Sequence, residues 1–165
     1  MAGASSWSFD ERDFQRIDRL LQGFLYDSGA RCTLLTDRTG QLVTTAGEKP
    51  EFDSVAFASL AAADFSANDQ LATMIGETEF SSLFHQGERE SMYLADVARR
   101  VILVVLFDNR TTLGMIRIKV KGVVRELSEH FSEMFSRAAT APAARVEAGF
   151  VDEAEDEIDR LFGDL

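Results

Sequence analysis

Residues 101–107 read Val-Ile-Leu-Val-Val-Leu-Phe, the longest apolar run in this chain of 165 residues. The run is much too short to cross a membrane as a helix. Its valines and isoleucine are β-branched, which favours a strand, and its lack of polar residues is typical of a strand covered on both faces or central in a sheet. We therefore expect the other elements to be arranged around this strand.

Four further segments have the composition of short strands. Cys32–Thr36 and Leu42–Thr45 are separated by Asp37-Arg38-Thr39-Gly40, a sequence typical of a hairpin turn. Leu83–Glu88 and Ser91–Val97 lead directly into the central run. The sequence therefore predicts five strands, with a hairpin first and three consecutive strands later.

Two amphipathic helices are predicted at the two ends of the segment that carries the strands. Apolar residues recur at helical spacing from Phe9 to Gly29, where the glycine suits a helix stop. A longer helix is predicted from about Thr111 to Arg137. Its expected buried positions are Leu113, Ile116, Val120, Val123, Leu127, Phe131 and Met134.

A third helix is predicted between the hairpin and the last three strands, from Asp53 or Ser54 as its cap to about Ile75, with Gly76 as its stop. One of its faces suits a core and comprises Leu60, Ala63, Ala67, Leu71 and Met74. The other face is mostly small and comprises Ala58, Ala62, Phe65, Ser66, Asp69 and Gln70. Such a face either allows a partner to approach closely or reflects only the high helix propensity of alanine. The order of elements is then α-β-β-α-β-β-β-α, an α+β chain.

The remaining segments define the domain boundaries. Residues 1–8 are expected to be a flexible N-terminus, residues 9–138 the domain, and residues 139–151 a flexible linker. Residues 152–165 are expected to form a short acidic amphipathic tail helix, in which Ile158, Leu161 and Phe162 share one face. Such a tail is typical either of a segment that folds on a partner or of a disordered end.

The charge and cysteine content exclude several classes of function. A net charge of −11 argues against nucleic acid as a partner, because phosphate binding needs a basic surface. Nothing in the sequence indicates a membrane partner, and the single cysteine, Cys32, is consistent with a reducing cytoplasm. Cys32 lies in an apolar strand, where an inert core thiol is expected.

The sequence also lacks the patterns that carry catalysis. It contains no glycine-rich phosphate-binding motif, and its two histidines, His85 and His130, are far apart without partners at metal-ligand spacing. We therefore expect no catalytic residues, no cofactor and no metal. Arg117, Lys121 and Arg125 instead form a basic stripe on the last helix. The stripe is either a solvated face or a docking surface for an acidic partner or for the chain's own acidic tail.

Several strings of this sequence, in this order, resemble the Roadblock/dynein-light-chain family and, within it, the bacterial MglB proteins. The most specific is residues 101–114, VILVVLFDNRTTLG, and others are residues 37–42, 75–77 and 84–88. Residues 158–162, IDRLF, resemble the end of MglB. The resemblance implies an antiparallel five-stranded sheet between helices, and a homodimer.

The resemblance also implies a function and a set of contact residues. Two subunits would bind one MglA-like Ras-family GTPase in its GTP-bound form, stimulate GTP hydrolysis and influence nucleotide exchange, which sets cell polarity for motility from a cluster at one cell pole. The GTPase-binding residues on the third predicted helix would be Ala62, Phe65, Ser66, Asp69 and Gln70, and the tail would dock through Ile158, Leu161 and Phe162. From its charge, the basic stripe of Arg117, Lys121 and Arg125 is expected to add to the GTPase-binding surface. Phe65 and Gln70 are bulkier than the small residues that relatives have there.

A second interpretation remains open, in which the chain is a non-catalytic Roadblock adaptor that scaffolds motor proteins or other polarity proteins. The tail favours the GTPase regulator, since plain adaptors usually end near the last long helix. An enzyme of unknown type is a distant third, because no active-site constellation is present in the sequence.

Overall fold

The computed structural model describes residues 9–140, and these residues contain three helices and five strands in the expected order. The elements are α1 (Glu11–Ser28), β1 (Cys32–Asp37), β2 (Leu42–Gly47), α2 (Ser54–Met74), β3 (Ser82–Gln86), β4 (Ser91–Val97), β5 (Val101–Phe107) and α3 (Leu113–Thr140). The chain divides into two units, residues 1–134 and residues 135–165. The packing described below is that of residues 9–134, and residues 135–140 of the second unit continue α3.

The five strands form one antiparallel sheet in the order β2-β1-β5-β4-β3. β5 is its central strand, paired with β1 on one side and with β4 on the other, and all seven of its residues are buried. The expectation drawn from its uninterrupted apolar sequence is therefore confirmed. β2 and β3 are the two edges of the sheet.

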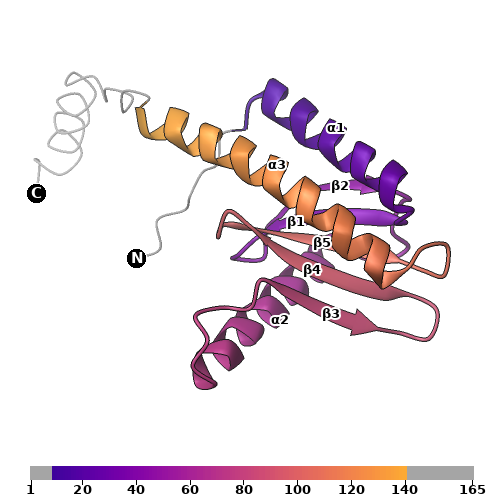
Figure 1. Cartoon of the computed structure of the whole chain (residues 1–165). Coiled ribbons are helices and arrows are strands. Elements are labelled where there is room, and N and C mark those ends of the chain that lie inside the picture. The colour runs from indigo at the N-terminus through magenta and orange to yellow at the C-terminus, as the bar shows by residue number, and fades with distance from the viewer. Residues whose placement is uncertain (1–8, 141–165) are drawn as a thin grey trace, which may run out of the picture. The chain divides into compact units, whose positions relative to one another are not determined.

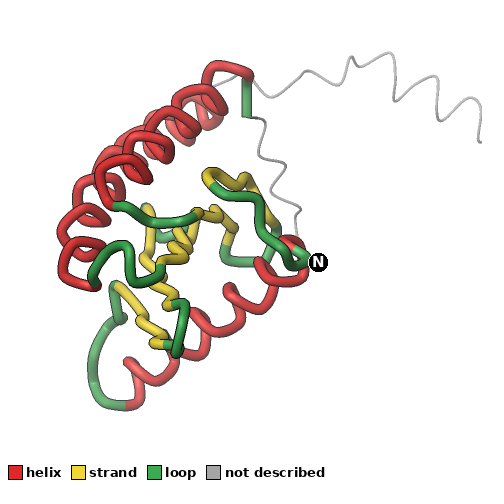
Figure 2. Tube along the Cα trace, turned by 90° about the vertical axis from the view of Figure 1, so that its right-hand side faces the viewer, coloured by secondary structure: helices red, strands yellow, loops and turns green. Residues whose placement is uncertain are grey.

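Helices cover both faces of this sheet. Figure 1 shows α1 and α3 together on one face and α2 alone on the other, and the perpendicular view in Figure 2 shows the same three layers. Side chains alternate along β5, so Ile102, Val104 and Leu106 pack in the cluster under α2 whereas Leu103 and Val105 point to the other face. Under α1 and α3, the core includes Ile17, Leu21, Phe24, Ile116, Val120, Val123, Leu127 and Phe131.

The predicted orientation of α2 is wrong, and its two faces are reversed. Leu60, Leu71 and Met74, expected in the core, are 70%, 58% and 82% exposed. Ala62 and Phe65, expected at the surface, are 4% and 0% exposed and pack on the sheet. The bulk of Phe65 is therefore explained by the core and not by a partner.

The reason for this orientation lies in the sheet beneath α2. The sheet surface is filled by large side chains, among them Leu34, Leu94 and Val104, which are fully buried. A helix approaches such a surface most closely through small residues, and most of the buried residues that α2 contributes are alanines. Phe65 is the one large side chain of α2 in this cluster of buried residues.

The helix boundaries follow local capping. Asp10 and Asp13 form a reciprocal capping box at the start of α1, and Asp53 caps α2. α3 starts later than predicted because the Thr112 hydroxyl accepts a hydrogen bond from the amide of Met115, 3.2 Å away. α3 also continues to Thr140, so residues 139 and 140, expected in a linker, are helical.

Residues 1–8, the rest of the predicted linker and the tail residues Ile158, Leu161 and Phe162 lie outside the described residues.

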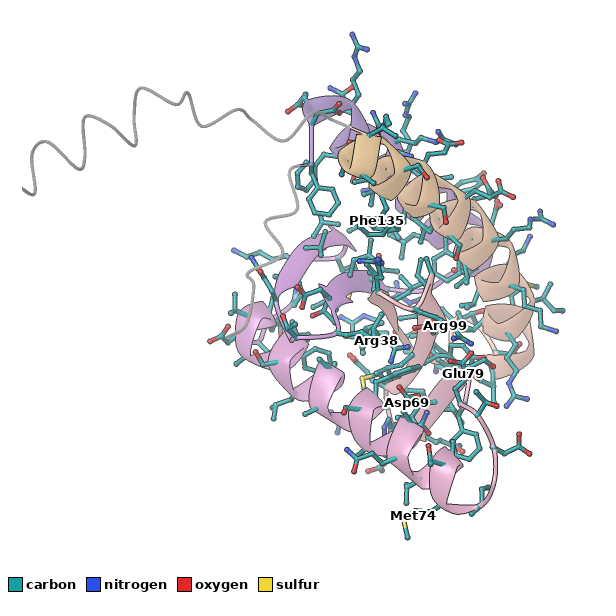
Figure 3. All side chains as sticks on the ribbon, turned by 90° about the vertical axis from the view of Figure 1, so that its left-hand side faces the viewer. Arg38, Asp69, Met74, Glu79, Arg99 and Phe135 are labelled. Carbon is teal, nitrogen blue, oxygen red and sulfur yellow. The ribbon has the colours of Figure 1, made fainter. Side chains whose placement is uncertain are left out.

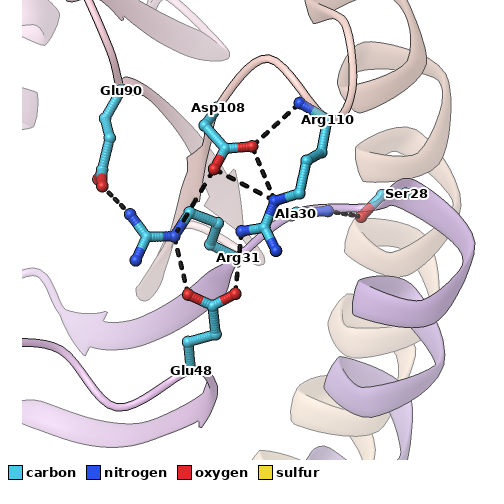
Figure 4. A network of polar contacts seen from close by, with 7 residues as sticks. All are labelled: Ser28, Ala30, Arg31, Glu48, Glu90, Asp108 and Arg110. Carbon is cyan, nitrogen blue, oxygen red and sulfur yellow. Dashed lines mark hydrogen bonds and ion pairs between the residues drawn. The ribbon is translucent and has the colours of Figure 1, made fainter.

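A network of ion pairs joins the strand ends at one margin of the sheet (Figure 4). Arg31 pairs with Glu48 and Glu90, and Arg110 pairs with Glu48 and Asp108, with the Arg31–Glu48 and Arg110–Glu48 pairs at 2.8 and 2.9 Å. Hydrogen bonds from Arg31 and Arg110 lower the pKa of the Glu48 carboxyl, and those from Arg110 lower the pKa of Asp108. These five side chains link the residues that flank β1, β2, β4 and β5.

None of the described helices combines the length and the apolar character that crossing a bilayer requires. Cys32 is buried in β1, as expected, and burial raises the pKa of its thiol.

Candidate protein-interaction surface

The outer face of α2 carries a row of exposed apolar side chains. Leu60, Leu71 and Met74 of α2, and Ile75 directly after its end, are all more than half exposed, and Figure 3 shows Met74 pointing away from the domain. Isolated apolar residues are ordinary on protein surfaces, but several on one face of one helix are typical of an interaction site. We call these four residues, together with Ala63 and Ala67, the apolar row.

Small residues occupy the middle of the apolar row. Ala63 and Ala67 are exposed, lie one helical turn apart, and are flanked by Leu60 on one side and Leu71 on the other. A second helix crossing at the two alanines could approach closely, because no long side chain stands in its way. Such a pattern fits a two-fold contact, in which the large residues of each helix pack beside the small residues of the other.

The free edge of the sheet adjoins the apolar row. Among the described residues, β3 is hydrogen-bonded to β4 and to no other strand, and its residues are half-buried or exposed. His85 of β3 lies with Nε2 2.6 Å from Asp64 Oδ2 of α2, so strand and helix are in direct contact. An exposed edge strand can add a strand from another chain. The apolar row and the β3 edge therefore form one continuous candidate surface.

The opposite flank of α2 is polar and faces the β1–β2 hairpin. The Ser59 hydroxyl donates to the Gly40 carbonyl at 3.2 Å, which places this flank beside the hairpin turn. Ser66 and Gln70 follow Ser59 along the same flank at helical spacing, and both are exposed. A surface of this kind offers hydrogen bonds without a large apolar area, which suits a contact that must form and dissociate.

Arg38 fixes the position of α2 on the sheet. Its guanidinium lies 2.6 Å from Asp69 of α2, also pairs with Asp96 of β4, and sits 5.4 Å above the ring of Phe65. Burial acts to lower the pKa of Arg38, but hydrogen bonds to Asp96 and Asp69 raise it above its ordinary value, so the side chain is charged. Figure 3 shows Arg38 and Asp69 close together between helix and sheet. Sequence reasoning missed this role, although Arg38 stands in the predicted turn.

The structure separates the residues that the sequence grouped as one binding site. Ala62 and Phe65 are buried, and Asp69 is engaged by Arg38, so these three cannot form a free contact surface. Ser66 and Gln70 are exposed. The basic stripe, Arg117, Lys121 and Arg125, is exposed as well but belongs to α3, on the opposite face of the sheet from α2 (Figure 1). No single globular partner can cover both sets through one flat contact.

Comparison with known proteins agrees with this fold. The Roadblock/LC7 domain model matches residues 16–107, from α1 to the end of β5. The chain belongs to the Roadblock/LC7 family. It is similar to Myxococcus xanthus MglB, with 38% identity, a TM-score of 0.72 and coverage of 76% of this chain and 95% of that one. It is also similar to the gliding protein MglB of Thermus thermophilus, with 28% identity, a TM-score of 0.72 and coverage of 78% and 97%.

Two further relatives extend the comparison. An MglB structure with a tetrameric arrangement matches with 28% identity and a TM-score of 0.73, over 78% of this chain and 97% of that one. A protein of Methanocaldococcus jannaschii is 28% identical over 116 residues, which are 70% of this chain and 99% of that protein. The Roadblock/LC7 match contains all of α2 and β3, and therefore the whole candidate surface.

Proposed function

We propose that this Roadblock/LC7 chain is a homodimeric regulator of an MglA-like Ras-family GTPase. It would stimulate GTP hydrolysis and, through its C-terminal tail, nucleotide exchange, and would act in the cytoplasm from a cluster at one cell pole to set polarity for motility. The likeness to two MglB proteins along nearly their whole length supports this assignment. The observation that carries it is the exposed apolar row beside a free sheet edge.

The dimer would form through the apolar row and β3. Pairing of two β3 edges about a two-fold axis would extend the sheet across both subunits and bring the two α2 helices side by side. The apolar row would then be buried between them, since it adjoins β3 through the His85–Asp64 contact. Burial of exposed leucine and methionine side chains supplies the driving force.

The GTPase would bind the polar flank of α2. Ser59, Ser66 and Gln70 lie on the side away from β3, so they would remain accessible after the dimer has formed. This flank carries hydroxyl and amide groups, which cannot supply the positive charge of an arginine finger. The regulator would therefore act by holding the GTPase in a conformation in which the GTPase's own residues stabilise charge on the transferring phosphoryl group.

Replacement of Ser66 by arginine tests this surface. A long cation on the polar flank would obstruct the GTPase, whereas the dimer surface one residue away would be untouched. We expect the unmodified protein to bind the GTP-analogue form of its GTPase at least about tenfold tighter than the GDP form, roughly 1.4 kcal/mol. Ser66→Arg should abolish that binding, as measured by calorimetry, and leave the dimer intact in light scattering.

Two outcomes would contradict this assignment in different ways. Equal affinity for the GTP-analogue and GDP forms would favour a Roadblock adaptor that scaffolds polarity or motor proteins. Unchanged GTPase binding by Ser66→Arg would place the contact elsewhere. Ala62→Arg is unsuitable as a companion variant because Ala62 packs against the sheet, where an arginine would disrupt the fold.

The tail is expected to have a separate role in nucleotide exchange. Leu161 and Phe162 lie outside the described residues, and replacement of both by alanine removes their apolar side chains without shortening the chain. Each large side chain contributes at most about 1.5–3 kcal/mol on burial, before the ordering cost, enough to adjust an equilibrium but not to hold the complex. The double variant should keep most of the stimulation of hydrolysis and lose acceleration of nucleotide release. Identical release rates in stopped-flow fluorescence would show that the tail has no such role.

A further inference from the structure

A groove runs between α1 and α3, on the face of the sheet opposite α2. Its volume is about 410 Å³, and its floor and walls include Leu20, Gly23 and Phe24 of α1 and Ile118, Gly122 and Val123 of α3. Ile118, at its margin, is 68% exposed. The groove therefore has apolar residues and glycines along its length between two antiparallel helices, with charged side chains among its lining.

Two glycines within these helices line the groove. Gly23 and Gly122 lie in helix interiors, where glycine is the least favourable residue apart from proline. A Cβ atom added at either position would meet nothing within 4 Å, whereas one added at Gly47 would lie 2.5 Å from the Arg31 carbonyl oxygen. Packing within the domain therefore requires glycine at Gly47 but not at Gly23 or Gly122. Close approach of an external backbone would account for both.

The charge around the groove identifies the kind of partner. Lys119 and Arg19 line it, and the basic stripe of Arg117, Lys121 and Arg125 runs along the adjoining surface of α3. Within residues 9–140, no carboxylate lies within ion-pair distance of these cations, although Arg16, Arg31, Arg38, Arg99 and Arg110 are all paired. Asp27 and Glu126 also line the groove and offset the charge of Lys119 and Arg19. The excess positive charge is thus that of the stripe, in a protein of net charge −11.

We propose that the groove between α1 and α3 docks an acidic amphipathic helix of a partner protein other than the GTPase. The apolar face of that helix would lie along Ile118 and the two glycines, and its carboxylates would pair with the basic stripe. Because the groove and α2 are on opposite faces of the sheet, both partners could bind at once (Figure 1). The regulator would then connect its GTPase to a second protein.

Two other occupants fit these observations less well. A second copy of the chain would place two basic stripes against each other in a two-fold contact, which is unfavourable. An anionic membrane would face the carboxylates of Asp27 and Glu126, and a flat bilayer would leave the hollow at the glycines unfilled. An acidic helix satisfies both the shape and the charge.

A model peptide tests the proposal without any GTPase or nucleotide present. The probe is a fluorescent helical peptide of about 18 residues with leucines on one face and glutamates elsewhere, compared with a counterpart that carries lysine for glutamate. We expect the full-length protein to bind the glutamate peptide in fluorescence anisotropy and not the lysine peptide. Gly122→Leu, which fills the groove, and Lys121→Glu, which reverses a charge, should each weaken binding at least about tenfold.

A matched control separates the groove from general electrostatics. Arg12→Glu changes the net charge by the same amount as Lys121→Glu, but Arg12 lies at the start of α1 and does not line the groove. This variant should keep its affinity for the glutamate peptide within about twofold. Gly122→Leu should unfold at the same or a higher temperature, because the leucine would face open space and favours the helix. An equal loss of binding in Arg12→Glu, or none in Gly122→Leu, would overturn the proposal.

Two further measurements distinguish the other occupants. If Leu161→Ala with Phe162→Ala makes the full-length protein bind the peptide more tightly, the chain's own tail competes for the groove and an external helix is not its occupant. If phosphatidylglycerol vesicles bind in a manner abolished by Lys121→Glu while the glutamate peptide does not bind, the surface is a membrane site and the proposal is wrong. Since the GTPase is absent throughout, failure here leaves the proposed GTPase regulation unaffected.

Discussion

Leu71→Arg is expected to convert the dimer into a folded monomer and to abolish stimulation of the GTPase. Leu71 is 58% exposed on α2, so an arginine there can reach water without disturbing the domain. In the proposed dimer, Leu71 of each subunit is buried at the interface. Loss of about 1.5–3 kcal/mol of burial free energy at each of these two positions weakens association at least about a hundredfold. Desolvation of two guanidinium groups adds to this loss.

Light scattering and GTP turnover check this expectation together. Leu71→Arg should have the mass of one chain of 18.3 kDa at micromolar concentration, with an unchanged circular dichroism spectrum. Ser66→Arg, on the polar flank of the same helix, should remain dimeric while it also fails to stimulate hydrolysis. A Leu71→Arg protein that stays dimeric would exclude the apolar row as the self-association surface.

Phe65→Ala is expected to destabilise the domain by about 3–5 kcal/mol, the usual effect of removing a buried phenylalanine ring. The ring is fully buried between α2 and the sheet, and Arg38 lies 5.4 Å above it. Its loss leaves a cavity among large side chains that cannot collapse fully, and also removes the cation–π contact. A large part of the stability of a domain this size would be lost.

The measurement compares two residues of α2 in urea unfolding, with Leu71→Arg as the background so that dissociation does not contribute. Leu60→Ala, at a position 70% exposed, should change the free energy of unfolding by no more than about 0.5 kcal/mol. A larger loss for Leu60→Ala than for Phe65→Ala would mean that α2 packs with the opposite face inward.

Local sequence was sufficient for most of the elements. β4 and β5 have the predicted bounds, because each begins and ends where its β-prone run does. β3 is shorter than predicted and ends at Gln86. The chain turns tightly at Gly87, where a Cβ atom would lie only 2.2 Å from the Glu90 carbonyl oxygen. The buried positions predicted for α3 are confirmed at Ile116, Val120, Val123, Leu127, Phe131 and Met134, whereas Leu113 is half-buried.

Hydrophobic pattern could not orient α2, so Ala62 and Phe65 were expected at a surface that they do not reach. α2 has apolar residues on both faces, larger on one and smaller on the other, and the usual rule assigns the larger ones to the core. Here the reverse holds, since the large residues of the sheet pack mainly against alanines of the helix, with Phe65 as the one fully buried large side chain that α2 contributes. The same reversal frees Leu60, Leu71 and Met74 for a partner.

By itself the sequence determined the order of elements, the central position of β5 and the family, because each depends on local composition or on strings along the chain. Only the tertiary structure decided which face of α2 is outside, that Arg38 holds α2 by two carboxylates from different elements, and that the basic stripe lies opposite α2. These features arise from the volumes and charges of residues far apart in the chain. Periodicity along one helix records which residues share a face, but the opposing surface determines which face it buries.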